Sequence, residues 1–325
     1  MRLRTISTAA LAGATLLVLA ACGGDDDGDG GTSDSGEGEL TPITLGALPI
    51  VPTAGLQYGI DEGIFEEHGF EVTLETGQGG AALIPGLVSG DIDFATSNPL
   101  SVMVAQSTGL AIQVTSGFVH AREEGDDITG VYAMPDSGIA APADLSGRTV
   151  AVNNLNTQGD VTIREMVRQD GGDPDAIEFV EIGFPDMPAA LDAGNIDAAW
   201  VAEPFGTILL GEGAELVGYN YQLVAPGLQT MVVIAAEDQD EQLVEDFHVA
   251  LEEVLTTAQE DEEGVRAVLP TLLEMDPELA DQVLIEEFDT QLDPEPLQIL
   301  ADLAWEGGVV ESEIDVEEFI PERAR

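Results

Sequence analysis

A nine-residue pattern that occurs twice in this chain indicates its fold. The first copy reads Leu87-Val88-Ser89-Gly90-Asp91-Ile92-Asp93-Phe94-Ala95, and the second reads Leu191-Asp192-Ala193-Gly194-Asn195-Ile196-Asp197-Ala198-Ala199. Both copies share the pattern Leu-x-x-Gly-x-Ile-Asp-x-Ala, which is typical of a helix that stops at glycine and is followed by a short buried strand.

The sequence around the two copies is also similar. A helical pattern precedes each copy, and a polar residue before proline follows it, Asn98-Pro99 in the first and Glu203-Pro204 in the second. A second helical pattern begins after each proline, so each copy forms part of an α/β unit. The repeat therefore predicts two related α/β lobes.

Further strands fit the same plan. Alternating strands and helices predict mostly parallel sheets, in which ligands bind beyond the carboxyl ends of the strands. The last third of the chain is expected to form one strand and then acidic amphipathic helices. Strands are expected at 42–48, 71–75, 112–119, 130–134, 149–153, 178–182, 198–201 and 230–236, and C-terminal helices at 239–259, 262–273, 277–287 and 295–306.

The N-terminus has the pattern of a bacterial lipoprotein signal. Arg2 and Arg4 precede an apolar stretch at 6–18 that is too short to span a bilayer, and Leu19-Ala20-Ala21-Cys22 follows. The pattern predicts a signal peptide at 1–21 and lipid on Cys22, which would hold an exported protein on the outer face of the cytoplasmic membrane. Residues 22–39 are mostly Gly, Asp, Ser, Thr and Glu and are expected to be a tether.

The charge is extreme. The chain has 63 acidic and 9 basic residues, a net charge of −54, and all the bases are arginine. Loss of Arg2 and Arg4 with the signal peptide would make the net charge −56, that is 7 − 63. Such a field repels nucleic acid, so we expect no nucleic-acid partner, and it predicts a protein adapted to a salt-rich habitat with an acidic proteome.

Several segments resemble a known family. The stretch Gly63-Ile64-Phe65-Glu66-Glu67-His68-Gly69-Phe70-Glu71-Val72 resembles a segment of the solute-binding proteins of ABC importers for nitrate, sulfonates, taurine and thiamine pyrimidines. The resemblance covers roughly residues 43–237, with Arg148 where the family usually has lysine. Further matching segments are Gly77-Gln78-Gly79-Gly80, Gly90 to Ala95, Asp144 to Val152, Gly194 to Ala198 and Glu203-Pro204.

This resemblance implies a type II periplasmic-binding-protein fold, with two lobes, two hinge crossings and a solute held between the lobes. We expect the crossings near 134–138 and 227–233. Lobe 1 would then contain residues 40–135 and 230–325, and lobe 2 residues 136–229. Closure of the lobes around the solute would be a hinge motion.

Candidate ligand contacts in lobe 1 lie where helices begin, because free backbone N–H groups there suit polar oxygens. Thr53 and Gln57 follow the first strand, and Gln78, Gly79 and Gly80 repeat that arrangement, with a simple turn as the alternative.

The two residues before proline have two possible roles each. The amide of Asn98 can read the ligand or cap the following helix. Glu203 can accept hydrogen bonds from an amino group of the solute, or it can serve as a helix cap or a bridge between the lobes.

In lobe 2 the resemblance places Thr157 and Gln158 in the cleft. Trp200 can stack on a planar solute, or it can be an ordinary buried tryptophan. His120 and Arg122 follow a strand, but a surface loop among acidic residues is the favoured interpretation for both.

Catalysis is not expected. There is no lysine for a pyridoxal-phosphate Schiff base, and neither G-x-S-x-G nor H-E-x-x-H occurs. We expect no cofactor, no metal site and a monomer that works with an ABC permease and ATPase. The alternative is an exported enzyme on the same fold, either similar to thiamine-pyrimidine synthase or a carboxylate-based hydrolase.

Overall fold

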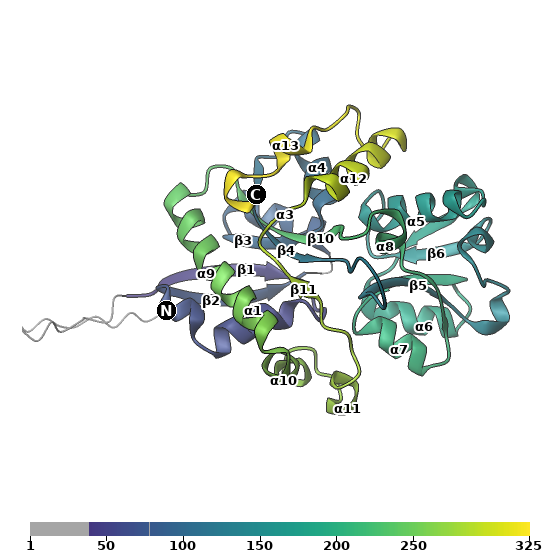
Figure 1. Ribbon diagram of the computed structural model, residues 1–325, viewed down its shortest axis with the longest axis horizontal. Helices are drawn as coiled ribbons and strands as arrows, with labels where there is room; N and C mark the ends of the chain where they lie inside the picture. Colours follow the sequence, from purple (N-terminus) through teal and green to yellow (C-terminus); the bar gives the residue numbers. More distant parts are fainter. Residues whose placement is uncertain (1–38, 78) are drawn as a thin grey trace, which may run out of the picture. The chain divides into compact units, whose positions relative to one another are not determined.

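The computed structural model describes residues 39–325 except Gln78, so Cys22, the expected signal peptide and the expected tether up to residue 38 lie outside the described residues. Two β-sheets with surrounding helices make up this part of the chain (Figure 1). None of the described helices is both long enough and apolar enough to cross a membrane.

The first sheet has six strands in the order β11-β4-β10-β3-β1-β2. Strand β1 pairs in parallel with β2 and β3, whereas β10 runs antiparallel between β3 and β4. The strands are β1 (Thr41–Ala47), β2 (Phe70–Thr76), β3 (Phe94–Ser97), β4 (Ile112–His120), β10 (Gln229–Ala236) and β11 (Glu287–Phe288).

The second sheet has five strands in the order β7-β6-β8-β5-β9. Strand β6 pairs in parallel with β7 and β8, and β5 runs antiparallel between β8 and β9. The strands are β5 (Thr129–Ala133), β6 (Thr149–Val152), β7 (Glu178–Glu181), β8 (Ala198–Ala202) and β9 (Glu215–Gly218).

The two sheets share one plan, since β2-β1-β3-β10-β4 corresponds strand by strand to β7-β6-β8-β5-β9. The repeated aspartate has the same role in both. Asp93 accepts a hydrogen bond from Thr44 N through its carboxylate (2.8 Å), and Asp197 accepts one from Thr149 N (2.8 Å). Each aspartate therefore fixes the strand after the repeat to its parallel neighbour, β1 or β6, which confirms the prediction of two related α/β lobes.

Most strands of each sheet run in one direction, as expected, but both sheets are mixed, because β10 and β5 run against their neighbours. Strand β10 enters the first sheet from lobe 2 and runs antiparallel to β3. Strand β5 enters the second sheet from lobe 1 and runs antiparallel to β8. Crossing strands of this kind do not follow the βαβ connection that makes neighbours parallel.

The helices largely follow the sequence pattern, with the repeat glycines Gly90 and Gly194 at positive φ (78° and 67°) where helical segments end. The α-helices are α1 (Thr53–Asp61), α2 (Ile64–Glu67), α3 (Gly80–Ser89), α4 (Pro99–Ser107), α5 (Gln158–Gln169), α6 (Met187–Asp192), α7 (Phe205–Gly211), α8 (Asn220–Val224), α9 (Glu241–Glu260), α10 (Glu262–Leu272), α11 (Pro277–Ala280), α12 (Pro294–Glu306) and α13 (Val316–Phe319). Short 3-10 helices lie at Pro135–Ser137, Pro142–Leu145, Pro174–Ala176, Phe184–Asp186 and Glu322–Ala324.

The chain changes sheets twice. The first crossing lies between β4 and β5, at 121–128, earlier than the expected 134–138, because β5 belongs to the second sheet. The return lies between α8 and β10, at 225–228, close to the start of the expected range. We therefore use lobe 1 for the residues around the first sheet and lobe 2 for those at 129–224.

The C-terminal part of the chain returns to lobe 1. Helix α9 covers the first sheet and places Phe247 against Phe94, with ring centroids 4.0 Å apart and an interplanar angle of 10°. The rings of Phe65 and Phe247 are also stacked, at 5.7 Å. These buried aromatic contacts hold the acidic helix on the sheet despite the high charge of its outer face.

One expected helix, at 277–287, is mostly absent. Helix α11 ends at Ala280, and the chain then runs to β11, which pairs antiparallel with β4. Gly117 permits this approach, since a Cβ there would lie 2.7 Å from the carbonyl oxygens of Asp289 and Gln291. Long-range strand pairing thus overrides the local helical preference of this segment.

Candidate functional site

A cavity lies between the two lobes, at the ends of strands from both sheets. The cavity and its open mouth together contain about 450 Å³ that no protein atom occupies, part of it open to solvent. Several of its residues end or follow strands, as expected for an α/β fold. The lining residues are Leu48, Ile50, Gly80, Asn98, Thr230, Met231 and Glu286 from lobe 1, Ile128 from the first crossing, and Thr129, Asn153, Phe184, Trp200, Ala202 and Tyr221 from lobe 2.

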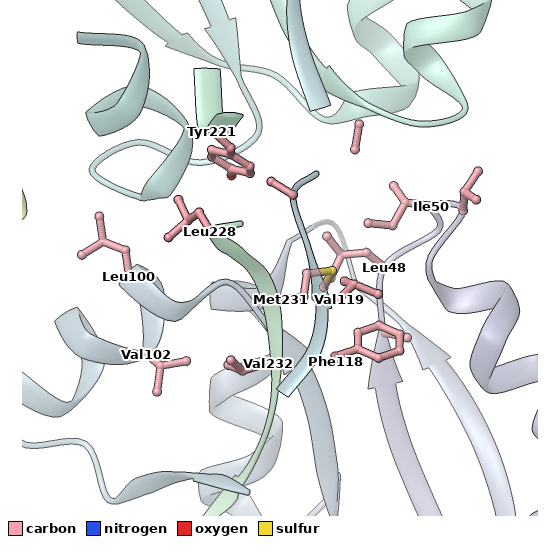
Figure 2. Close-up of a cluster of buried hydrophobic side chains, with 14 of the residues drawn as sticks. Leu48, Ile50, Leu100, Val102, Phe118, Val119, Tyr221, Leu228, Met231 and Val232 are labelled. Atoms are coloured by element: carbon pink, nitrogen blue, oxygen red, sulfur yellow. The ribbon is translucent and has the colours of Figure 1, made fainter. Parts of the chain in front are cut away.

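One wall of the cavity is aliphatic. Leu48 and Ile50 follow β1, and Met231 comes from β10 (Figure 2). Tyr221 of α8 lies on the opposite side in the same view. The wall is continuous with the buried core, so a solute in the cavity would contact a rigid apolar surface.

The lobe 2 side of the cavity is aromatic. The Trp200 ring lies 5.5 Å from that of Phe184 and 5.8 Å from that of Tyr221. Trp200 Nε1 donates to Asn220 Oδ1 (2.9 Å), which fixes the indole in place. Trp200 lines the cavity and is also a largely buried core residue (5% exposed), and its stacking on a solute stays a prediction.

Asn98 caps a helix and also lines the cavity, and its contact with a ligand stays a prediction. Its Oδ1 accepts a hydrogen bond from Ser101 N (2.8 Å) and caps α4, and its side chain lines the cavity. Gly80, at the start of α3, lines the cavity as well and packs against Ser97 so closely that a Cβ would lie 2.6 Å from Ser97 Cα.

Six of the described candidate residues do not line the cavity: Thr53, Gln57, Gly79, Thr157, Gln158 and Glu203. Thr53 Oγ1 donates to Leu48 O (2.6 Å), and Gln57 Nε2 donates to Asp61 on the exposed side of α1. Thr157 begins α5, where its backbone N–H donates to Asp160 Oδ1 (2.7 Å). Gln158 Nε2 donates to the backbone oxygen of Gln229 (2.8 Å) and so joins α5 to the start of β10. Gln78 lies outside the described residues.

Glu203 is turned away from the cavity and caps α7. Its carboxylate accepts from Thr207 N (3.2 Å) and Thr207 Oγ1 (2.8 Å), and its backbone oxygen accepts from Val51 N of lobe 1 (3.1 Å). Burial raises the pKa of the Glu203 carboxyl to about 7, although its hydrogen bonds act in the opposite direction. The position of Glu203 therefore fits a helix cap and interlobe bridge, the alternative to ligand contact.

His120 and Arg122 lie at the first crossing and do not line this cavity. Arg122 Nη2 donates to Ile285 O (3.0 Å), and Arg122 Nε lies 3.9 Å from Glu287 Oε1. His120 Nδ1 lies 3.1 Å from Ala121 O. Both residues thus hold the crossing against the C-terminal segment.

Sequence reasoning missed one lining residue of note, Glu286. Its side chain is buried (2% exposed), and Oε1 accepts a hydrogen bond from Thr230 Oγ1 (2.9 Å). Burial raises the pKa of this carboxyl well above its usual range. No local signal distinguishes Glu286 among 63 acidic residues, because only the pairing of β11 with β4 brings it into the cavity.

Gly79 of lobe 1 lies against Asn154 of lobe 2 near this site. A Cβ on Gly79 would overlap Asn154 Oδ1 of lobe 2, whereas the φ of Gly79, −176°, is open to any residue. We therefore expect Gly79→Val to hold the lobes apart and to weaken solute binding by roughly 10-fold or more, the equivalent of a typical overpacking cost. Calorimetric titration would measure this.

Asn154→Ala provides the matched control for that experiment. In the Gly79→Val background it removes the overlapping side chain, so binding should recover. Unchanged binding by Gly79→Val alone would show that the two lobes do not need to meet at this point.

No group of three or more His, Cys, Asp or Glu side chains suited to a metal ion occurs within residues 39–77 and 79–325. The cavity is instead a mostly apolar chamber with a few polar groups. This composition suits non-covalent capture of a small molecule.

Comparison with known proteins agrees with this geometry. The chain is 24% identical over 234 residues to a putative ABC transporter periplasmic binding protein of Brachyspira hyodysenteriae, covering 68% of this chain and 64% of that protein. It is 28% identical over 177 residues to the taurine-binding periplasmic protein of Escherichia coli, covering 53% of this chain and 52% of that protein. The matches thus span between about half and two thirds of the length of these relatives.

Solved structures show the same fold. The alkanesulfonate-binding protein SsuA from Xanthomonas axonopodis pv. citri, bound to MOPS, superposes with a TM-score of 0.74 at 16% identity, over 87% of this chain and 99% of that chain. The periplasmic nitrate-binding protein NrtA from Synechocystis gives a TM-score of 0.73 at 14% identity, over 86% and 85% of the two chains. The fold is therefore that of the periplasmic binding proteins.

The family model described as NMT1/THI5 like matches residues 52–264, which contain the complete second sheet, both crossings and most of the cavity lining. Together with the two-lobed architecture, this match shows that the chain belongs to the NMT1/THI5-like family.

Proposed function

We propose that this protein is the solute-binding component of an ABC importer. The observation that carries the proposal is the cavity, which is lined by residues from both lobes and lies beside both crossings. Hinge closure of two lobes around such a space captures a small solute and releases it on opening. The relatives named as periplasmic binding proteins support the same role.

The solute we propose is a small nitrogen- or sulfur-containing compound of the sulfonate, taurine, nitrate or thiamine-pyrimidine class. Asn98 and Trp200 from the sequence-based set line the cavity, as does Gly80, and we propose all three as contacts. The captured solute would pass unchanged to a permease driven by an ATPase. The protein would act as a monomer, exported and anchored by lipid on Cys22.

A thermal-shift screen tests the proposal. Taurine, alkanesulfonates, nitrate, pyrimidines and short amides would each be added in excess, and a bound solute at about 100 times its Kd should stabilise the protein by about 2.7 kcal/mol. For a chain of this length that corresponds to a rise in Tm of several degrees. Recovery of the solute unchanged after incubation separates a receptor from an enzyme.

If no compound raises the Tm, the proposed solute class is wrong. If the bound compound is recovered in a chemically altered form, the receptor assignment fails and the alternative of an enzyme on this fold gains support.

A further inference from the structure

Glu286 presents an unpaired carboxylate oxygen at the cavity. Oε1 is occupied by Thr230 Oγ1 (2.9 Å), but Oε2 is buried and has no partner among the described residues. A buried acceptor without a donor is costly, and such groups in native structures call for an explanation. A donor group on a bound solute would satisfy Oε2 directly.

The cavity holds no positive charge to offset this carboxyl. No arginine or histidine is among its lining residues, and within residues 39–77 and 79–325 every arginine lies within 4.0 Å of a carboxylate elsewhere. Arg122 is nearby, but it donates to Ile285 O and Asp126 O instead of to Glu286. An anionic solute would meet a carboxyl group and no cation.

Neighbouring acids make the site still less suited to an anion. Burial is the main cause that raises the pKa of Glu286, and the carboxyls of Asp127 and Glu203 raise it further, while the Thr230 hydroxyl and Arg122 lower it. Tyr221, the remaining titratable group that interacts with it, has its own pKa raised by burial. The local field therefore favours a positive group.

The walls of the cavity suggest the shape of that positive group. Phe184, Trp200 and Tyr221 present aromatic rings from lobe 2, and Leu48 and Ile50 present aliphatic side chains from lobe 1. Aromatic rings favour flat solutes and attract cations through their electron-rich faces. A flat body with a cationic end fits both features.

We infer that Glu286 is the residue that selects the solute, by accepting N–H hydrogen bonds from a flat organic cation and excluding anions. This inference rests on the proposed solute-binding function and narrows its substrate class. It departs from the sulfonate and nitrate named for the structural neighbours, because their ligands carry negative charge.

Proton exchange gives a second readout. A cation binds the ionised form of Glu286, whose pKa in the free protein is raised, so binding displaces a proton where that carboxyl is still protonated. The affinity for the cation should then rise with pH and level off once the pH exceeds the pKa of the Glu286 carboxyl in the free protein. A purely structural role of Glu286 would produce no such linkage.

Three nearly isosteric probes separate charge from shape: benzamidinium, benzamide and benzoate. We expect benzamidinium to raise the Tm of the full chain most, benzamide less, and benzoate, nitrate and alkanesulfonates not at all. Titration in buffers of different ionisation enthalpy should show protons released on binding of benzamidinium.

Glu286→Gln should weaken benzamidinium binding by roughly 10- to 100-fold, the usual effect of losing a hydrogen bond to a charged group. Because glutamine is as neutral as the protonated carboxyl and keeps an acceptor for Thr230, the Tm of the variant without solute should not fall. Glu287→Gln is the matched control, since Glu287 is the next residue, its side chain is 50% exposed and it does not line the cavity.

The outcomes are distinct. Stabilisation by benzoate, nitrate or a sulfonate in place of benzamidinium would overturn the inference and leave the proposed function intact, as would full benzamidinium binding by Glu286→Gln. No stabilisation by any probe or any compound of the thermal-shift screen would overturn the proposed function and the inference with it.

Discussion

At pH 8, Glu203→Gln is expected to be more stable than the parent protein. Burial raises the pKa of Glu203 to about 7 in the folded protein, against 4.5 for an ordinary glutamate. A raised folded-state pKa stabilises the protein below the unfolded pKa, and that contribution is lost as the pH rises from about 4.5 to about 7. The ionised carboxylate therefore costs roughly 3 kcal/mol at pH 8, and glutamine removes this cost.

The measurement is chemical denaturation of both proteins between pH 4 and pH 8. The gain from Glu203→Gln should be largest at pH 8 and should shrink towards pH 4, because the parent carboxyl is protonated there. Glutamine keeps an oxygen that can accept from Thr207, so the helix cap should survive.

Glu212→Gln is the matched control, since Glu212 lies at the other end of α7 and is exposed. It should change stability little at any pH beyond a small effect on net charge. A loss of stability in Glu203→Gln that is equal at all pH values would show that the carboxylate itself is needed as a cap.

Molar salt is expected to stabilise the protein by several kcal/mol, which is about 5 to 10 °C in Tm for a domain of this size. The chain carries 63 acidic residues against 9 basic ones. Raising NaCl from about 0.1 M to about 1 M shortens the Debye length from about 10 Å to about 3 Å and so weakens the repulsion between surface carboxylates.

Ion pairs with arginine cannot neutralise most of this repulsion between carboxylates. Each of the seven arginines beyond Arg4 already lies near a carboxylate, as in the pairs Arg148–Asp197 and Arg266–Glu262. Within residues 39–77 and 79–325 no arginine is left for the other acids, and partly exposed pairs of this kind contribute little.

The measurement is the free energy of unfolding as a function of NaCl concentration, with sucrose of equal osmolality as the control for solvent exclusion. The proposed salt-rich habitat would be contradicted if stability stayed the same between low and molar salt.

The elements of the fold follow from local sequence. The helix–glycine–strand pattern ending at Ala95 and Ala199 predicts the same unit twice, and the structure has it twice, with Asp93 and Asp197 in equivalent hydrogen bonds. Strands such as β4 and β10 also lie within a residue or two of their expected positions. Such features depend on periodicity and glycine stops, which act over a few residues.

The candidate site follows from sequence only in part. Asn98, which follows β3, and Trp200, which lies within β8, line the cavity because these two repeat strands reach it from the two lobes. Gln57 does not, although it lies on the helix after β1, because its side chain is on the exposed face of that helix. Position along the chain gives the neighbourhood of a residue, while helix rotation decides its direction.

By itself the sequence determined the α/β class, the repeated lobes and the strand ends from which a site is built, since these depend on residues close together along the chain. Only the tertiary structure decided that the first crossing precedes β5, that the sheets are mixed and that Glu286 reaches the cavity. The last depends on the pairing of β11 with β4 beside Gly117, a contact between segments about 170 residues apart that no local pattern encodes.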